Sequence, residues 1–176
     1  MLINKIIIYH GTTENAGKEI LKEGKIVGSN PDQVRVKNTE RGYVFFSDSL
    51  GTALHYGSFK QSFNNECDPI PFYVFKLIMD KDDLLEDCYE TNHMKSFTAN
   101  FKPNFYKIKG DVTLSDYECK YAEIKSVGDI DSSNKVVNTI TKINSAYFHF
   151  DDNTLYREAK NFVNGNNLIW NDYQDK

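Results

Sequence analysis

The sequence predicts a single domain of the α+β class that spans residues 1–176. A chain of 176 residues is long enough to bury one hydrophobic core. Short apolar runs rich in branched and aromatic side chains predict strands, and helical spacing predicts helices between and after them. Because no stretch has linker composition, we expect a core over about residues 5–130 and a C-terminal helical extension over 131–176.

The amino-acid composition indicates which kinds of binding partner the protein favours. With 21 basic and 25 acidic residues the formal net charge is −4, which gives no overall attraction to nucleic acid or anionic membranes, although a local basic patch is compatible with it. No apolar run approaches the length of a membrane span, and we expect a monomer without a membrane partner. Aromatic residues make up 14%, which suits strands and also stacking on flat ligands.

The cysteines and histidines predict neither disulfides nor a metal site. The cysteines are odd in number, match no zinc or redox motif and follow no signal peptide, so we expect free thiols in a reducing cytoplasm. No two histidines have the spacing of a metal-binding helical pair, so we expect no metal site. These residues are Cys67, Cys88, Cys119, His10, His55, His93 and His149.

The first informative stretch is an apolar run that ends in polar residues. Ile6–Ile8 predicts a buried strand, and His10 and Gly11 are expected at its rigid end. Gly11 has no Cβ, so a flat ligand could approach its backbone closely. The plainer alternative is an ordinary strand–turn–helix unit whose histidine has its hydrogen bonds satisfied.

A helix and a polar loop are expected next. Thr12 or Thr13 can cap the helix, and Gly24 is expected to end it. Lys25–Arg41 has turn composition and is either a solvated surface loop or a flexible cover whose cations meet a phosphate. The cations of this loop that we single out are Arg35, Lys37 and Arg41.

The second informative stretch predicts another strand followed by a helix. Tyr43–Phe46 reads as the strand, and Ser47–Ser49 can cap a helix whose apolar face includes Ala53. Tyr56 follows just before Gly57. Taken singly, Phe45 and Tyr56 are better explained as core residues than as ligand contacts.

Further strands are expected in the second half of the core. Pro71–Met79 is the strongest strand pattern and Phe105–Ile108 is a second, whereas Leu84–Pro103 fits either a short strand or a loop. Tyr117–Ile124 alternates with period two, so Glu118 and Glu123 should point to opposite faces. The alternative for each glutamate is an exposed acid on a strand.

The tail predicts two helices on the outside of the domain. Apolar residues recur at helical spacing in two groups, and Asp151–Thr154 between them can cap the second helix. The apolar positions are Val136, Val137, Ile140 and Ile143, then Leu155, Ala159, Phe162 and Val163.

The motifs occur in a familiar order. His10-Gly11-Thr12, then Ile20–Gly24, Tyr43–Ser47, Ala53-x-x-Tyr56 and Tyr117-Glu118 together resemble the diphtheria-toxin/PARP-like branch of the ADP-ribosyltransferase fold, with its His–Tyr–Glu triad. The resemblance covers about residues 5–130. It implies two small, mostly antiparallel sheets that face each other across an NAD cleft, with helices outside.

The resemblance assigns a role to each matching residue. His10 would hydrogen-bond an NAD ribose hydroxyl, Gly11 would hold the nicotinamide amide through its backbone, and Tyr56 would stack on the nicotinamide ring. Glu118 would be the catalytic glutamate, with His10 beside it, because a fixed carboxylate stabilises the oxocarbenium-like ribose. The remaining expected NAD-binding positions are Thr12, Tyr43, Phe45 and Ser47.

The sequence departs from the family pattern at two positions. The triad tyrosine aligns with Phe45, although Tyr43 lies on the same strand face, and the serine that binds the nicotinamide amide aligns with Ala53, next to Thr52. Both departures remove polar contacts and leave the catalytic acid, which is compatible with a weaker, altered or absent NAD reaction.

The resemblance implies mono-ADP-ribosyl transfer from NAD to an unknown protein or nucleic-acid acceptor. A toxin or phage–host conflict role would suit a small solitary domain, by analogy of fold alone. The first alternative is an inactive module that binds ADP-ribose or nucleic acid. The second is a different reaction, either NAD glycohydrolysis or the 2′-phosphotransfer of a related branch, which relies on basic residues that contact phosphate.

Overall fold

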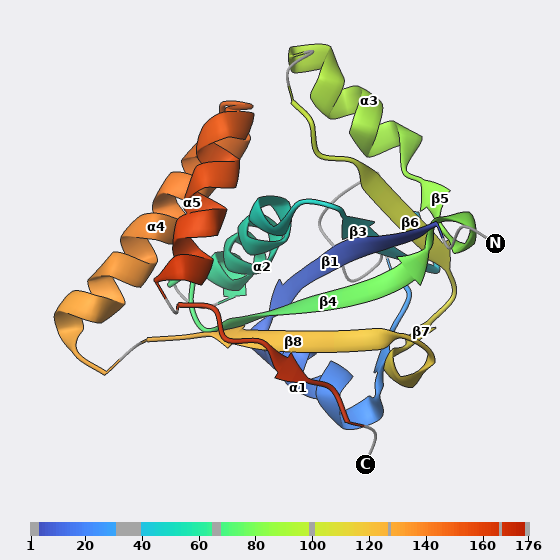
Figure 1. The fold of residues 1–176 in the computed structure, drawn as a ribbon, viewed down its shortest axis with the longest axis horizontal. Helices are drawn as coiled ribbons and strands as arrows, with labels where there is room; N and C mark the ends of the chain where they lie inside the picture. Colours follow the sequence, from blue (N-terminus) through green and yellow to red (C-terminus); the bar gives the residue numbers. More distant parts are fainter. Residues whose placement is uncertain are drawn as a thin grey trace.

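The computed structural model describes residues 4–30, 40–64, 68–98, 101–126, 128–165 and 167–174 (Figure 1). It confirms the α+β class, with antiparallel sheets and helices on both sides. The helices are α1 (Glu14–Glu23), α2 (Leu50–Asn64), α3 (Cys88–Phe97), α4 (Ile130–Phe148) and α5 (Asp152–Asn164), with short 3₁₀ helices at Lys81–Asp83 and Leu114–Asp116. The strands are β1 (Lys5–Thr13), β2 (Lys25–Ile26), β3 (Tyr43–Ser47), β4 (Phe72–Asp80), β5 (Leu85–Glu86), β6 (Phe105–Lys109), β7 (Val112–Thr113), β8 (Glu118–Ile124) and β9 (Asn171–Asp172).

Seven of the described strands form one sheet and not the two facing sheets that the resemblance implies, and the narrowest pairing in it is between β1 and β3. Its strand order in the described residues is β5-β6-β3-β1-β4-β8-β9, and β2 and β7 form a separate pair. β1 pairs with β4 over its whole length, but the register between β1 and β3 contains one pair of residues, Tyr9 and Ser47. The residues of β1 beyond Tyr9 therefore pair with β4 and not with β3.

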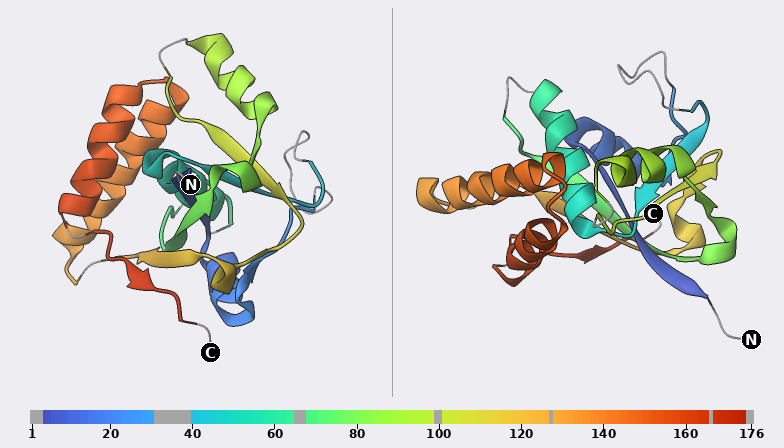
Figure 2. Two further views of the ribbon diagram at one scale, coloured as in Figure 1. Left: turned by 45° about the vertical axis from the view of Figure 1, so that its right-hand side comes forward. Right: turned by 90° about the horizontal axis from the view of Figure 1, so that it is seen from above.

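Each face of the sheet has its own hydrophobic core. On one face, Ile8 and Phe75 pack with Ile20 of α1 and with the β2–β7 pair. On the other face, Val74 of β4 packs with Ala53 of α2 and with the apolar faces of α4 and α5. Figures 1 and 2 show α4 and α5 as an antiparallel pair beside α2.

The first two predicted units are present, with longer elements than expected. β1 continues through His10 to Thr13, so His10 and Gly11 lie within a paired strand and not at its end. Thr13 caps α1 by accepting the Ala16 N–H, and Gly24 ends the helix with a left-handed backbone (φ 70°), as predicted. α2 does not end near Gly57 but continues to Asn64.

The ambiguous stretch from Leu84 contains a helix that was not predicted. α3 occupies Cys88–Phe97, after the two-residue strand β5. Only Thr91 and Met94 of this helix are buried, so the apolar periodicity that reveals a helix is weak. Its clearest signal is Asp87, whose side chain accepts the Glu90 N–H three residues later.

The tail forms two helices that pack on the outer side of α2, as predicted, and their apolar faces join the core that β4 and α2 share. Val136, Ile140 and Ile143 of α4 and Phe162 of α5 are fully buried in the same cluster as β4 and α2. Their apolar faces lie against α2, which separates them from the sheet. This packing brings Tyr147 of α4 to Tyr56 of α2.

The cysteine and membrane predictions can be compared with part of the chain. Cys88 and Cys119 are free thiols, whereas Cys67 lies outside the described residues. Among the described helices, none combines the length and apolar character that crossing a membrane requires.

Candidate functional site

His10 is held at the junction between β1 and β3. Its Nδ1 lies 2.9 Å from the carbonyl oxygen of Phe45, and its ring meets Phe46 edge-on with centroids 5.8 Å apart. A carbonyl oxygen only accepts, so Nδ1 carries the proton and donates. In the neutral ring the other nitrogen, Nε2, is then an acceptor that can receive a hydrogen bond from a hydroxyl.

Burial keeps His10 neutral. It lowers the pKa of His10 to about 4, with a smaller contribution from the positive charge of Lys60, while the Phe45 carbonyl acts in the opposite direction. At neutral pH the residue therefore accepts at Nε2 and carries no charge. The ribose contact that the resemblance implies for His10 stays a prediction.

Lys60 lies beside Tyr56, the aromatic residue that the resemblance assigns to nicotinamide stacking. Lys60 and Tyr56 are four residues apart on α2, and the lysine Nζ lies 5.9 Å from the centroid of the Tyr56 ring. The same ammonium influences the pKa of His10. His10 is on the Ile8 and Phe75 face of the sheet, whereas α2 packs on the other face, so Lys60 influences His10 only through its charge.

Tyr56 is hydrogen-bonded to a carboxyl group that the sequence analysis missed. Its hydroxyl donates to Glu90 Oε1 over 2.7 Å, and Tyr147 Oη lies 3.0 Å from Tyr56 Oη and 3.4 Å from the same Glu90 oxygen. Burial raises the pKa of both tyrosines, so both hydroxyls are protonated donors at neutral pH. The three residues come from α2, α3 and α4, and Figure 1 shows α2 between the other two helices.

Glu118 does not share this site, which corrects the predicted pairing with His10. Glu118 of β8 pairs with Ile78, which pairs with Ile7 of β1, whereas His10 pairs with Phe75. Side chains alternate between faces along a strand, so His10 is on the opposite face from Ile7 and Glu118. Glu118 is exposed there, and the expectation that it shares a cleft with His10 is wrong.

Glu123 is on the same face as His10 but is engaged elsewhere. It pairs across the strands with Tyr73, which pairs with Thr12. Its carboxylate lies 3.0 Å from Lys125 Nζ and accepts a hydrogen bond from Tyr73, whose pKa is raised to about 12, mainly by burial and also by Glu123. As the sequence predicted, Glu118 and Glu123 point to opposite faces.

Gly11 is required by packing. A Cβ on Gly11 would lie 1.9 Å from the Ala53 carbonyl oxygen and 2.9 Å from the Gly57 nitrogen. The backbone of α2 therefore occupies the space next to the Gly11 Cα. Gly57 permits the same close approach, because a Cβ there would lie 2.5 Å from the Phe72 ring and 3.3 Å from the Thr12 nitrogen.

The remaining predicted site residues are spread along β1 and β3. Ser47 donates to the Asn104 carbonyl and accepts the Ser49 N–H, so its hydroxyl supports the start of α2. Tyr43 lies beneath Lys107, with Nζ 5.0 Å from the ring centroid. Tyr43, Phe45 and Ser47 share one strand face, and Thr12 is buried in β1. Arg35 and Lys37 lie outside the described residues, and Arg41 is exposed.

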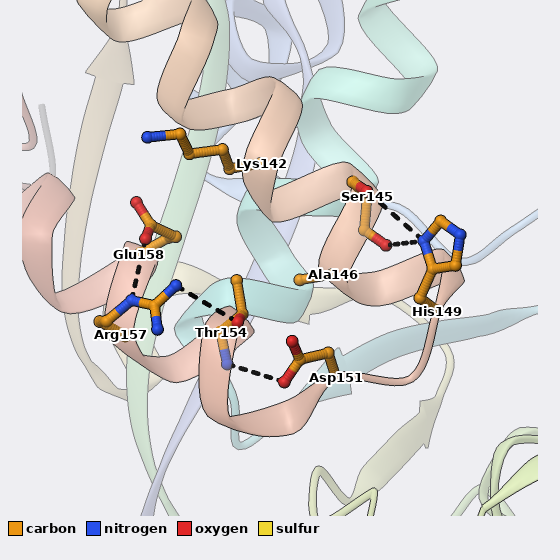
Figure 3. Close-up of a pocket in the computed structure, with 8 residues that line it drawn as sticks. All are labelled: Lys142, Ser145, Ala146, His149, Asp151, Thr154, Arg157 and Glu158. Carbon is orange, nitrogen blue, oxygen red and sulfur yellow. Dashed lines mark hydrogen bonds and ion pairs between the residues drawn. The ribbon is translucent and has the colours of Figure 1, made fainter.

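A smaller cavity of about 330 Å³ lies between α4 and α5 (Figure 3). Its polar groups are bonded to one another: Arg157 donates to Thr154 and Glu158, and Asp151 accepts the Thr154 N–H. His149 likewise bonds within its own helix. The hydrogen bonds that these residues make to one another therefore give no indication of a ligand in this cavity.

A larger cavity of about 700 Å³ lies between α5, the start of α2 and the segment before β6. Its lining includes Tyr9, Leu50, Pro103 and Tyr156. Tyr9 precedes His10 and therefore points to the other sheet face. Neither of these two cavities is lined by His10, Tyr56 or Glu90.

The described residues contain no group of three or more His, Cys, Asp or Glu side chains arranged to hold a metal ion. The functional groups available at the candidate site are thus a neutral histidine, a lysine, and two tyrosines that are hydrogen-bonded to one carboxyl group.

None of the family models, curated proteins or solved structures compared with the chain matches it.

Proposed function

We propose that this protein is a mono-ADP-ribosyltransferase that uses NAD as donor, with Glu90 as the carboxylate that the sequence had assigned to Glu118. The observation that carries the proposal is the 2.7 Å hydrogen bond between Tyr56 and Glu90. It joins the residue expected to stack on nicotinamide to an acid that is only partly buried.

In the proposed binding mode, Tyr56, Lys60 and His10 each contact a different part of NAD. The nicotinamide ring stacks on Tyr56, and the ammonium of Lys60, now over that ring, moves on its flexible side chain to the NAD diphosphate. His10 accepts a ribose hydroxyl at Nε2 because its Nδ1 proton is committed to Phe45. Burial lowers the pKa of Lys60, and pairing with the diphosphate would favour its charged form.

The reaction breaks the bond between ribose C1′ and the nicotinamide nitrogen. The bonding electron pair leaves with nicotinamide, which becomes neutral, and positive charge develops on the ribose. The Glu90 carboxylate would stabilise this charge electrostatically. A lone pair of the acceptor then forms the new bond to C1′, and the acceptor loses its proton to solvent.

A binding module without catalysis remains the second candidate, and one observation favours it. Glu90 Oε1 is already within hydrogen-bonding reach of two tyrosine hydroxyls, so the carboxyl group is satisfied without a substrate. In this reading Tyr56, Lys60 and His10 would hold ADP-ribose or a related ligand and no bond would break.

Incubation of the pure protein with NAD labelled in the adenylate part, with and without cell lysate, tests the proposal. Label on protein or nucleic acid supports the transferase. Release of free ADP-ribose alone would indicate a glycohydrolase, and bound but unconsumed NAD would indicate the binding module. A lysate treated with protease or nuclease before the reaction would identify the class of acceptor.

A further inference from the structure

Tyr147 brings the C-terminal helix pair into the candidate site. It lies one residue before the end of α4, and its hydroxyl reaches Tyr56, Glu90 and, at 3.8 Å, the sulfur of Met94. The side chain is buried, with 6% of its surface exposed. Because Tyr56 donates its proton to Glu90, the Tyr147 hydroxyl is the partner that can donate to the Tyr56 oxygen.

The Tyr147 ring is held in place by the imidazole ring of His55, which stacks on it. The His55 ring stacks on it with centroids 3.9 Å apart and planes inclined by 14°. His55 is held in turn by Asn144, whose Oδ1 is 2.8 Å from His55 Nδ1 and also accepts from Ser58. The Tyr147 hydroxyl therefore has little freedom to leave Tyr56 and Glu90.

We propose that Tyr147 is a positioning residue that holds the Tyr56–Glu90 pair in the geometry needed for ADP-ribosyl transfer. This inference rests on the proposed function. Tyr147 acts through its hydroxyl, which fixes the Tyr56 oxygen, and Tyr56 in turn fixes one carboxylate oxygen of Glu90. The second Glu90 oxygen then faces the developing charge from a defined position.

The test uses Tyr147→Phe, which keeps the stacked ring and removes only the hydroxyl. We expect kcat for NAD consumption to fall about tenfold, the effect of one lost hydrogen bond in the transition state, with KM for NAD changed less than about twofold. Tyr156→Phe is the matched control, because Tyr156 is exposed in α5 and the same atom is removed outside the network. The control should behave as wild type, and all proteins should be compared by thermal unfolding.

A double-mutant cycle separates positioning from general loosening of the fold. If Tyr147 acts through Glu90, adding Tyr147→Phe to Glu90→Gln should lower kcat by less than about twofold further. Additive losses, or a Tyr147→Phe effect confined to KM or to thermal stability, would overturn the positioning role while leaving the transferase proposal standing. Absence of NAD turnover by the wild-type protein with every lysate would overturn both.

Discussion

His10 and Glu118 point to opposite faces of the same sheet. The strand register links Glu118 through Ile78 to Ile7, three positions before His10. An odd number of steps along a strand changes the face, so the separation does not depend on side-chain rotamers. The acid of β8 that shares the His10 face is Glu123, which Lys125 and Tyr73 engage, whereas Glu90 on α3 is the acid that contacts Tyr56.

We expect Glu90→Gln to reduce the rate of ADP-ribosyl transfer by about two to three orders of magnitude, with NAD binding largely retained. Gln has nearly the same shape and can still accept from Tyr56, but it carries no negative charge. Rates from steady-state NAD consumption and affinity from calorimetry measure the two effects separately.

Glu118→Gln is the matched control for this variant. It makes the same chemical change on the opposite sheet face, at an exposed position, and should leave the rate within about twofold of wild type. A large loss in Glu118→Gln with none in Glu90→Gln would show that the acid has been assigned to the wrong residue.

Gly11→Ala should strongly destabilise the fold. The added Cβ would lie 1.9 Å from the Ala53 carbonyl oxygen, and because this atom belongs to the α2 backbone, the helix must move away from β1. We expect a loss of about 3 kcal/mol or more in the free energy of unfolding, measured with urea.

Gly110→Ala provides a comparison for the change from Gly to Ala. Gly110 has nothing within 4 Å of an added Cβ, and its backbone has a positive φ of 91°. It should cost about 1 kcal/mol through backbone strain alone. Equal losses in the two variants would argue against tight contact between α2 and β1.

The stability of the protein should fall as the pH is lowered from about 6.5 to 4. Burial lowers the pKa of His55 to about 4, against about 6.5 for an unfolded histidine, and His10 behaves in the same way. In this window the unfolded chain binds protons that the native protein does not, so acid favours unfolding. The full effect is on the order of 3 kcal/mol for one such histidine.

Urea unfolding at several pH values can isolate this contribution by comparing wild type with His55→Gln. Carboxyl groups also titrate in the window, but they do so in both proteins. The slope of unfolding free energy against pH should be smaller in the variant, whatever its absolute stability. Parallel slopes would mean that His55 binds its proton over the same pH range in the native and unfolded states.

Cys119 should resist alkylation in the native protein while Cys88 reacts. Burial raises the pKa of the Cys119 thiol to about 12 and also blocks access, whereas Cys88 is exposed at the start of α3. Brief treatment with iodoacetamide at neutral pH, followed by peptide mass spectrometry, assigns the label to individual cysteines. Cys119 should be labelled only after unfolding in urea, and rapid native labelling there would contradict its burial.

Local patterns in the sequence determined much of the framework. Ile6–Ile8 predicted the strand β1, although only Ile8 of the three is buried and Ile7 is exposed on the other face. Gly24 predicted the end of α1 because it adopts a left-handed backbone at little cost. The alternation in β8 also separated Glu118 from Glu123. Each of these results depends on residues that are neighbours in the chain.

Tertiary structure alone decided which side chains meet at the candidate site. Strand alternation puts Glu118 and Glu123 on different faces, but only the register through β4 shows which face His10 shares. Tyr56 reaches Glu90 across 34 positions and Tyr147 across 91, through three helices whose packing no local pattern encodes. The side chains converge because α2 packs on β1 at Gly11 and on α4, while Met94 of α3 joins the same core, a result of packing between surfaces that are distant in sequence.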